Sequence, residues 1–286
     1  MASIWLDCDN QELLKNRLAS LVQEDRLTGV MINSSKYKAS MSEDEFIKDI
    51  QDACEVLMDK YDDGEDGFVC CSIDMSLAKD TKKIVTFAKE IFQKVEKDNF
   101  MVAIPATKEG IEALSKLSTK VMNLCATHIF SPNQASMSAK ALTNLERNCE
   151  AVLRVEVAAF DKLLNVELAT NNLSKDRIGF FNAIKIYNQI SQTKLPNVNL
   201  KVCFSDLAVH QNWLEKGYYV EQLNLHNAIL NLPIDVIDYY EDEELPEAFE
   251  FQTKHIDAFL SYLSYANISL QSTYETLLNN ALKEAL

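Results

Sequence analysis

The stretch FVCCSID at Phe68–Asp74 is a short run of almost continuous apolar residues that stands before a segment of helical period. The segment after it carries Ile84, Phe87, Ile91 and Val95, whose spacing of three and four residues buries one stripe of a helix. Continuous apolarity, in place of strict alternation, is typical of parallel strands that are covered on both faces. This stretch therefore predicts a strand followed by a covering helix.

The same unit recurs along the rest of the chain. Another helix is predicted from Phe46, Ile50, Ala53 and Leu57, and Ser42 with Glu45 has the spacing of a capping box at its start. Counting apolar runs of this kind gives eight predicted strands. They are Ser3–Asp7, Leu27–Ile32, Phe68–Asp74, Phe100–Pro105, Met122–Ile129, Ala151–Val157, Asn199–Phe204 and Asn227–Leu232.

Eight strand-then-helix units in 286 residues favour a single (β/α)8 TIM barrel domain over residues 1–286. An open doubly wound sheet is the alternative, but no GxGxxG or GxxxxGK[ST] loop follows any predicted strand. From about Gln252 to the end, the periodicity predicts one or two extra helices packed on the barrel. The acidic stretches Asp62–Gly67 and Glu241–Glu247 are predicted to be solvated loops.

Composition excludes several classes of function. A formal net charge of −15 without a basic cluster argues against a nucleic-acid partner. The chain lacks a signal-peptide pattern and a run of about 20 apolar residues, so we expect no membrane partner and a cytoplasmic location. The seven cysteines have no CxxC pair, which predicts reduced core thiols and no metal site.

Several stretches, in order, resemble one known family. MVAIPATKEG at 101–110 and CATHIFSPNQA at 125–135 look like the fourth and fifth strands of transaldolases. The similarity extends over most of the chain, through SIWLD at 3–7, GVMINS at 29–34, CSIDMSL at 71–77 and VEVAAFDKLLN at 155–165. The resemblance implies a barrel of the pentose phosphate pathway that transfers a dihydroxyacetone unit between sugar phosphates. It also implies a Schiff-base lysine on the fourth strand and no cofactor or metal.

At four positions, a catalytic or substrate-binding group that this resemblance implies has been lost. Ala103 stands where the family has its Schiff-base lysine, and a methyl group cannot form an imine. Ser72 replaces the glutamate that holds the catalytic water, Cys125 replaces an asparagine, and Ala159 replaces a phosphate-binding arginine.

Other positions keep the family residue or a relative of it. Asp7 matches the acid/base aspartate of the first strand, and Thr127 matches a threonine of the fifth. Asn33 matches the asparagine after the second strand, in an altered setting, and His210 matches a basic residue after the seventh. Without a lysine to serve, Asp7 is equally suited to pairing with Arg154 or to capping the next helix.

Arg154 and Glu156 replace a pocket serine and a pocket aromatic residue. Alternate residues of a barrel strand face the same way, so both side chains are expected to point into the former pocket. We favour a buried ion pair that fills the space left by the lost lysine and glutamate, and a new ligand site is the alternative.

The sequence therefore leads to a hypothesis of a non-catalytic transaldolase homologue with a binding or regulatory role. We expect it to bind a sugar phosphate or another small metabolite, and a protein partner that the sequence does not identify. Analogy with the family also suggests a homodimer. A working transaldolase or related aldolase, with Lys201 or Lys108 in the catalytic role, is the alternative. An engineered Ala103 is disfavoured, because Ser72 and Ala159 have changed as well.

Overall fold

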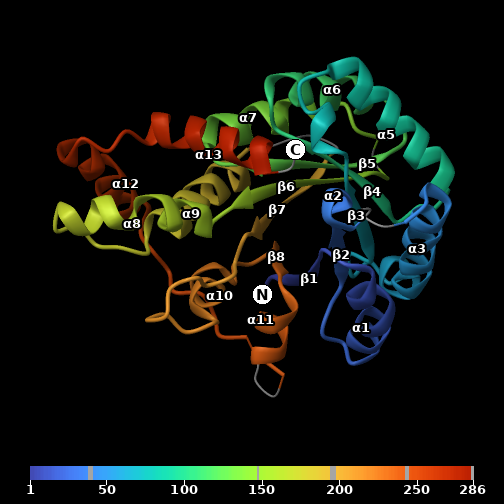
Figure 1. The fold of residues 1–286 in the computed structure, drawn as a ribbon, viewed down its shortest axis with the longest axis horizontal. Coiled ribbons are helices and arrows are strands. Elements are labelled where there is room, and N and C mark those ends of the chain that lie inside the picture. Colours follow the sequence, from blue (N-terminus) through green and yellow to red (C-terminus); the bar gives the residue numbers. More distant parts are fainter. Residues whose placement is uncertain (38–40, 147, 194–197, 242–244, 285–286) are drawn as a thin grey trace.

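The computed structural model describes residues 1–37, 41–146, 148–193, 198–241 and 245–284. Within these ranges, eight parallel strands form a closed barrel in chain order, and the last strand pairs with the first. Helices surround the strands (Figure 1). The predicted (β/α)8 barrel is confirmed. The strands are β1 (Ser3–Cys8), β2 (Gly29–Ile32), β3 (Phe68–Ser72), β4 (Phe100–Pro105), β5 (Asn123–Ile129), β6 (Glu150–Glu156), β7 (Asn199–Ser205) and β8 (Ala228–Leu232).

The helices begin at side chains that satisfy free backbone N–H groups. Asn10 Oδ1 accepts from the Leu13 amide at 2.9 Å, and the predicted capping box of Ser42 and Glu45 is present. The α-helices are α1 (Gln11–Gln23), α2 (Ser34–Tyr37), α3 (Glu43–Val56), α4 (Met58–Asp62), α5 (Thr81–Val95), α6 (Lys108–Leu117), α7 (Pro132–Ala141), α8 (Ala158–Thr170), α9 (Ile178–Ser191), α10 (Tyr218–Leu223), α11 (Ile234–Tyr239), α12 (Thr253–Tyr262) and α13 (Leu270–Glu284), with 3-10 helices η2 (Met75–Leu77) and η3 (Leu263–Ala266).

Each predicted strand is present, and the boundaries differ by at most two residues. β4 has the predicted bounds, whereas β2 begins two residues later than predicted, at Gly29. The prediction carried β3 on to Asp74, but that side chain accepts from the Ser76 amide at 2.8 Å and caps η2. A polar side chain that caps the following turn therefore ends the strand earlier than the apolar pattern predicts.

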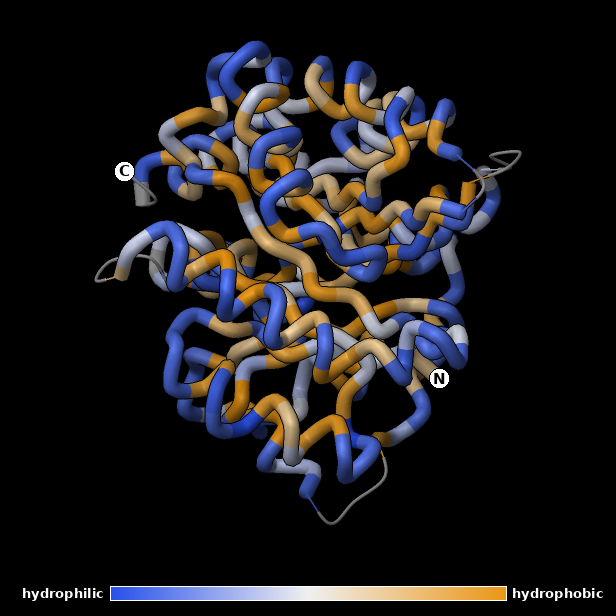
Figure 2. Tube along the Cα trace, turned by 90° about the vertical axis from the view of Figure 1, so that its right-hand side faces the viewer, coloured by the Kyte–Doolittle hydropathy of each residue, from blue (hydrophilic) through white to orange (hydrophobic). Residues whose placement is uncertain are grey.

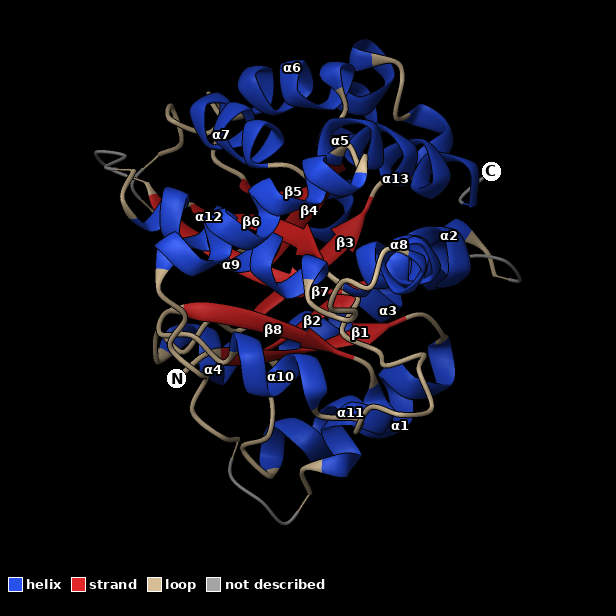
Figure 3. Ribbon diagram, turned by 90° about the vertical axis from the view of Figure 1, so that its left-hand side faces the viewer, coloured by secondary structure: helices blue, strands red, loops and turns tan. Residues whose placement is uncertain are grey.

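The barrel wall separates two apolar layers. One large cluster lies between the strands and the helices, and a smaller one fills the barrel interior. The hydropathy tube shows apolar segments inside and polar segments on the periphery (Figure 2), and the strands lie within a shell of helices (Figure 3). The buried members of the interior cluster are Trp5, Met31, Phe68, Cys70, Met101, Ala103, Cys125, Val152, Cys203 and Ile229.

Strand register arranges the inward side chains in layers of four. Strands in an eight-stranded barrel are staggered, so each layer takes residues from alternate strands. The upper layers are assigned by following the register around the barrel with this stagger. The register pairs used include Asp7↔Met31, Ser72↔Ala103, Cys125↔Val152 and Arg154↔Cys203. From the carboxyl end inward, one layer holds Asp7, Ser72, Thr127 and Ser205, the next Met31, Ala103, Arg154 and Asn231, and the third Trp5, Cys70, Cys125 and Cys203.

An ion pair closes the amino end of the barrel. Lys201, near the start of β7, pairs with Asp66 from the loop before β3, and the Trp5 indole donates to the same carboxylate at 3.2 Å. Only 6% of Asp66 is exposed, so the prediction of a solvated loop at Asp62–Gly67 was wrong at this residue. The second loop predicted to be solvated, Glu241–Glu247, lies partly outside the described residues.

One or two C-terminal helices were predicted, and two are present, α12 and α13. Leu282 of α13 packs with Met75 and Ala78, which follow β3. At its other end, the Tyr274 ring lies 5.9 Å from the Phe160 ring of α8, centroid to centroid. Because α8 follows β6, α13 bridges the segments that follow two separate strands, β3 and β6.

Two further sequence-based expectations can be compared with the structure. All seven cysteines are buried and form no disulfide, which confirms the prediction of core thiols. Among the described residues, no helix has the length and apolarity needed to cross a membrane.

Candidate active site at the carboxyl end of the barrel

Ala103 lies in the middle of β4 with its methyl group inside the barrel. It is fully buried and pairs in register with Ser72 on one side and Cys125 on the other. Its layer also holds Arg154, so the positive charge at this depth comes from β6 and not from β4. A guanidinium stays protonated and does not form an imine, so this layer offers no nucleophilic amine.

The Ser72 hydroxyl has a structural partner in Ser34, the first residue of α2, directly after the loop that follows β2. It accepts from the Ser34 amide at 3.0 Å and lies 3.3 Å from the Ser34 hydroxyl. Asn33, the residue before, is half-buried at the carboxyl end of β2, and its backbone amide donates to the Cys8 carbonyl at 2.9 Å. Ser72 therefore fastens this loop to β3, and its hydroxyl supplies no carboxylate.

Arg154 and Glu156 form the predicted ion pair. The distance from Arg154 Nε to Glu156 Oε1 is 3.4 Å, and the two side chains are 13% and 7% exposed. Arg154 Nε also donates to Ser205 Oγ at 2.8 Å, and Asn231 Nδ2 donates to the same oxygen at 3.1 Å. The pair thus belongs to a buried polar cluster contributed by β6, β7 and β8.

This cluster shifts the protonation of its members. Burial raises the pKa of Glu156 to about 7, although the Arg154 charge acts in the opposite direction. Burial disfavours the charge of Arg154, yet Glu156 and Asp7 together raise its pKa above the ordinary value. Glu156 is therefore close to half-ionised at neutral pH, whereas Arg154 is charged.

Asp7 takes neither of the structural roles that the sequence suggested for it. The cap of α1 is Asn10, and no ion pair joins Asp7 to Arg154 within 4.0 Å. The carboxylate is half-buried on an inward position of β1, and it makes no hydrogen bond or ion pair with any described residue. Both structural explanations were wrong, and a carboxylate remains free at the mouth of the barrel.

Thr127 and Cys125 are buried on β5, and Thr127 lies within an irregularity in the wall. The pairing of β5 with β6 shifts between Ala126 and Ile129, and His128 has a φ of 55° within that shift. Thr127 Oγ1 lies 3.0 Å from His128 Nδ1. Burial and the Arg154 charge lower the pKa of His128 to about 3, so this imidazole is neutral.

A carboxylate of the chain itself occupies the start of α8. Asp206, directly after β7, accepts from the Ala159 amide through Oδ2 at 2.6 Å, and its carbonyl accepts from the Ala158 amide at 3.0 Å. Burial raises the pKa of Asp206, and the Ala159 amide and His210 act in the opposite direction. His210 itself is exposed. The start of a helix is a common anion-binding site, and the resemblance implies a phosphate-binding arginine at position 159. In this chain, the Asp206 carboxylate occupies that anion position.

Comparison with known proteins agrees with this architecture. The family model described as Transaldolase/Fructose-6-phosphate aldolase matches residues 3–285. The chain belongs to the transaldolase/fructose-6-phosphate aldolase family. A transaldolase of Helicobacter pylori is 30% identical, over 98% of this chain and 94% of that protein. A transaldolase of Campylobacter jejuni subsp. doylei is 27% identical, over 99% and 94% of the two chains.

Neither lysine considered as a substitute lies in the candidate site of this family member. Lys201 faces the barrel interior, which settles its orientation, but it lies near the amino end of β7 and pairs with Asp66. It is three layers below Ala103 in the stagger of the strands. Lys108 is the first residue of α6, and its side chain is exposed.

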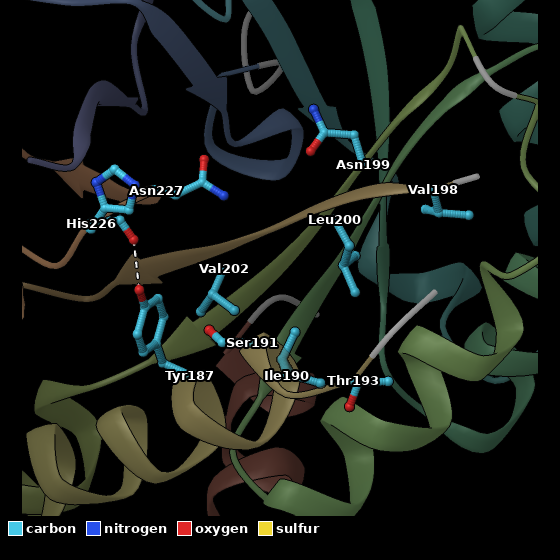
Figure 4. A pocket seen from close by; sticks show the side chains of 10 residues that line it. All are labelled: Tyr187, Ile190, Ser191, Thr193, Val198, Asn199, Leu200, Val202, His226 and Asn227. Carbon is cyan, nitrogen blue, oxygen red and sulfur yellow. Dashed lines mark hydrogen bonds between the residues drawn. The ribbon is translucent and has the colours of Figure 1, made fainter. Parts of the chain in front are cut away.

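A cavity of about 870 Å³ lies away from the candidate site. It is lined by the end of α9 and the residue Thr193 after it, by residues of β7 and by residues just before β7 and β8 (Figure 4). Within it, the Tyr187 hydroxyl donates to the His226 carbonyl at 2.6 Å. None of the predicted site residues lines this cavity, and no group of three or more described His, Cys, Asp or Glu side chains is arranged to hold a metal ion.

The structure brings together most of the predicted site residues of this family member and adds three that the sequence did not single out. Asp7, Ser72, Thr127, Ala103 and Arg154 lie in two adjacent layers. The added residues are Ser205, Asp206 and Asn231. Ser205 and Asn231 could have been found because they alternate with the other inward residues at the ends of β7 and β8. Asp206 could have been found because it directly follows β7.

Proposed function

We propose that this member of the transaldolase family has lost Schiff-base catalysis and acts by binding a small metabolite at the mouth of its barrel. In this proposal it is a cytoplasmic pseudoenzyme whose occupied barrel is sensed by a protein partner. The observation that carries the proposal is the fully buried methyl group of Ala103, in a layer whose only cation is the Arg154 guanidinium.

The loss of two supporting groups points the same way. Ser72 is engaged by the Ser34 amide and has no carboxylate to hold a water. Asp206 occupies the start of α8 beside Ala159, where a transferred sugar phosphate would need a cation. A lysine alone would therefore lack both its water-activating partner and its substrate clamp.

A migrated lysine has less support. Lys201 is engaged by Asp66 at the other end of the barrel, and Lys108 extends into solvent. A Schiff-base lysine needs an apolar surrounding that keeps its amine neutral, and neither environment provides one.

A direct test is an aldol-transfer assay with fructose 6-phosphate and erythrose 4-phosphate. The related Helicobacter pylori transaldolase serves as the positive control under the same conditions. We expect no turnover above the background without enzyme. Turnover that scales with the concentration of this protein would contradict the proposal.

A further inference from the structure

Four residues at the mouth of the barrel, Asp7, Arg154, Glu156 and Asn231, each keep polar atoms that make no hydrogen bond within the described residues. The Asp7 carboxylate has no hydrogen-bonding or ionic partner among the described residues. Glu156 Oε1 and Asn231 Oδ1 are buried without a hydrogen-bond partner in the described part of the chain. Arg154 engages its neighbours through Nε, and no described residue accepts from its two terminal nitrogens. Buried polar atoms normally have a partner, so a bound molecule is a candidate partner for Glu156 Oε1 and Asn231 Oδ1.

The unused groups lie in one small volume. Arg154 and Asn231 share a layer and both donate to Ser205 Oγ, at 2.8 and 3.1 Å. Asp7 lies in the layer above, and its charge acts on both Arg154 and Glu156. The three acceptors and the one fork of donors therefore come from inward positions in neighbouring layers of β1, β6 and β8.

The charges define what this space can accept. Asp7 and the partly ionised Glu156 together carry more negative charge than the one guanidinium offsets, so a ligand with an ammonium group matches the acceptors. The free fork of Arg154 requires oxygen acceptors such as hydroxyl groups. Asp206 already holds the Ala159 amide and adds a third carboxylate nearby, which opposes a phosphorylated ligand.

We infer that the mouth of this barrel binds a small, unphosphorylated primary amine with hydroxyl groups. Its ammonium is held by Asp7, Glu156 and Asn231, and a hydroxyl oxygen accepts from Arg154. The inference rests on the proposed function, in which this site binds a metabolite, and it specifies the chemical class of that metabolite.

The test is isothermal titration calorimetry on the full chain with three matched probes. They are glucosamine, glucose, which lacks the ammonium, and glucosamine 6-phosphate, which adds the phosphate. A charge-assisted hydrogen bond is worth about tenfold or more in affinity, so glucosamine should bind about tenfold more tightly than either other probe. Equal binding of glucosamine and glucose, tighter binding of glucosamine 6-phosphate, or no measurable binding of glucosamine would overturn the inference.

Two variants assign the effect to the residues. Asp7→Asn should weaken glucosamine binding by about tenfold while thermal unfolding stays unchanged, because Asp7 has no structural partner among the described residues. Glu12→Gln, an exposed acid on α1, is the matched control and should bind as the unaltered protein does. Asp206→Asn should reduce the difference between the affinities for glucosamine and for glucosamine 6-phosphate, because it removes the carboxylate that opposes the phosphate. An unchanged affinity in Asp7→Asn would refute the assigned site.

The calorimetric result is separable from the proposed loss of catalysis. Glucosamine is not a substrate of the aldol-transfer assay, so binding and turnover are measured independently. An inactive protein that ignores glucosamine would refute only the ligand class. An active protein would refute the loss of catalysis, whatever it binds.

Discussion

Arg154 Nε lies 3.4 Å from Glu156 Oε1, so two residues of one strand place a cation and an acid side by side inside the barrel. The family resemblance implies a lysine on β4 and a glutamate on β3, at Ala103 and Ser72 in this chain. Opposite charges are thus retained in the interior, but they come from β6 and include no nucleophile.

Removing one partner of this pair should cost more than removing both. Arg154→Met leaves Glu156 buried without its cation, for which we expect a loss of about 3–5 kcal/mol in the free energy of unfolding. The double variant Arg154→Met, Glu156→Met should recover most of that loss, because apolar side chains of similar size need no partner. Urea denaturation measures both values. A double variant less stable than the single one would show that the pair is itself a main source of stability.

The acid of the pair should also give stability a characteristic pH dependence. The pKa of Glu156 is raised by burial from 4.5 to about 7 in the folded protein. The folded state therefore holds this proton more tightly than the unfolded state, and the resulting stabilisation is complete below about pH 4.5 and lost as the pH rises through about 7. Glu156→Gln cannot ionise, so its stability should fall less over that window. If the free energy of unfolding changed with pH in the same way in both proteins, a raised pKa of Glu156 would be excluded.

Restoring a lysine at Ala103 should not restore transaldolase activity. The new amine would share a layer with Arg154 and would still lack the carboxylate that Ser72 has replaced. General acid–base groups contribute about 10²–10⁴-fold in rate, so Ala103→Lys should remain at least about a hundredfold below an active family member. The same aldol-transfer assay measures this, and adding Ser72→Glu should increase the rate. Activity of Ala103→Lys comparable to the Helicobacter pylori enzyme would contradict the expectation.

The second ion pair, at the amino end of the barrel, should be purely structural. Lys201→Met leaves the buried Asp66 without its cation, and we expect a loss of about 3 kcal/mol in the free energy of unfolding. Lys216→Met is the matched control, since Lys216 and Asp235 are 3.7 Å apart and more than half exposed. Its effect should stay below about 1 kcal/mol. Equal effects of the two substitutions in urea denaturation would show that Lys201 has no special role.

The barrel could be predicted from sequence because each strand is covered on both faces. That burial produces the apolar runs at Phe68–Ser72 and Phe100–Pro105, and only their ends needed correction. Parity along β6 likewise predicted that Arg154 and Glu156 would meet, because their spacing alone puts them on one face.

The partners of the site residues could not be predicted in the same way. Which residue caps α1, and whether Asp7 reaches Arg154, depend on side-chain distances that periodicity does not encode. Asp66 became buried because Lys201, distant in the sequence, needs a counter-charge, whereas the local composition of its loop is that of a solvated turn.

Borohydride trapping with fructose 6-phosphate, read out by intact-protein mass and peptide mapping, tests the proposed loss of Schiff-base catalysis most directly. It detects a Schiff base whether or not an acceptor sugar is used. Because Ala103 carries no amine and Lys201 is held by Asp66, we predict that the mass of the protein stays unchanged. A substrate-derived mass increase that maps to any lysine within the barrel would contradict the account and show that the covalent chemistry of the family persists here.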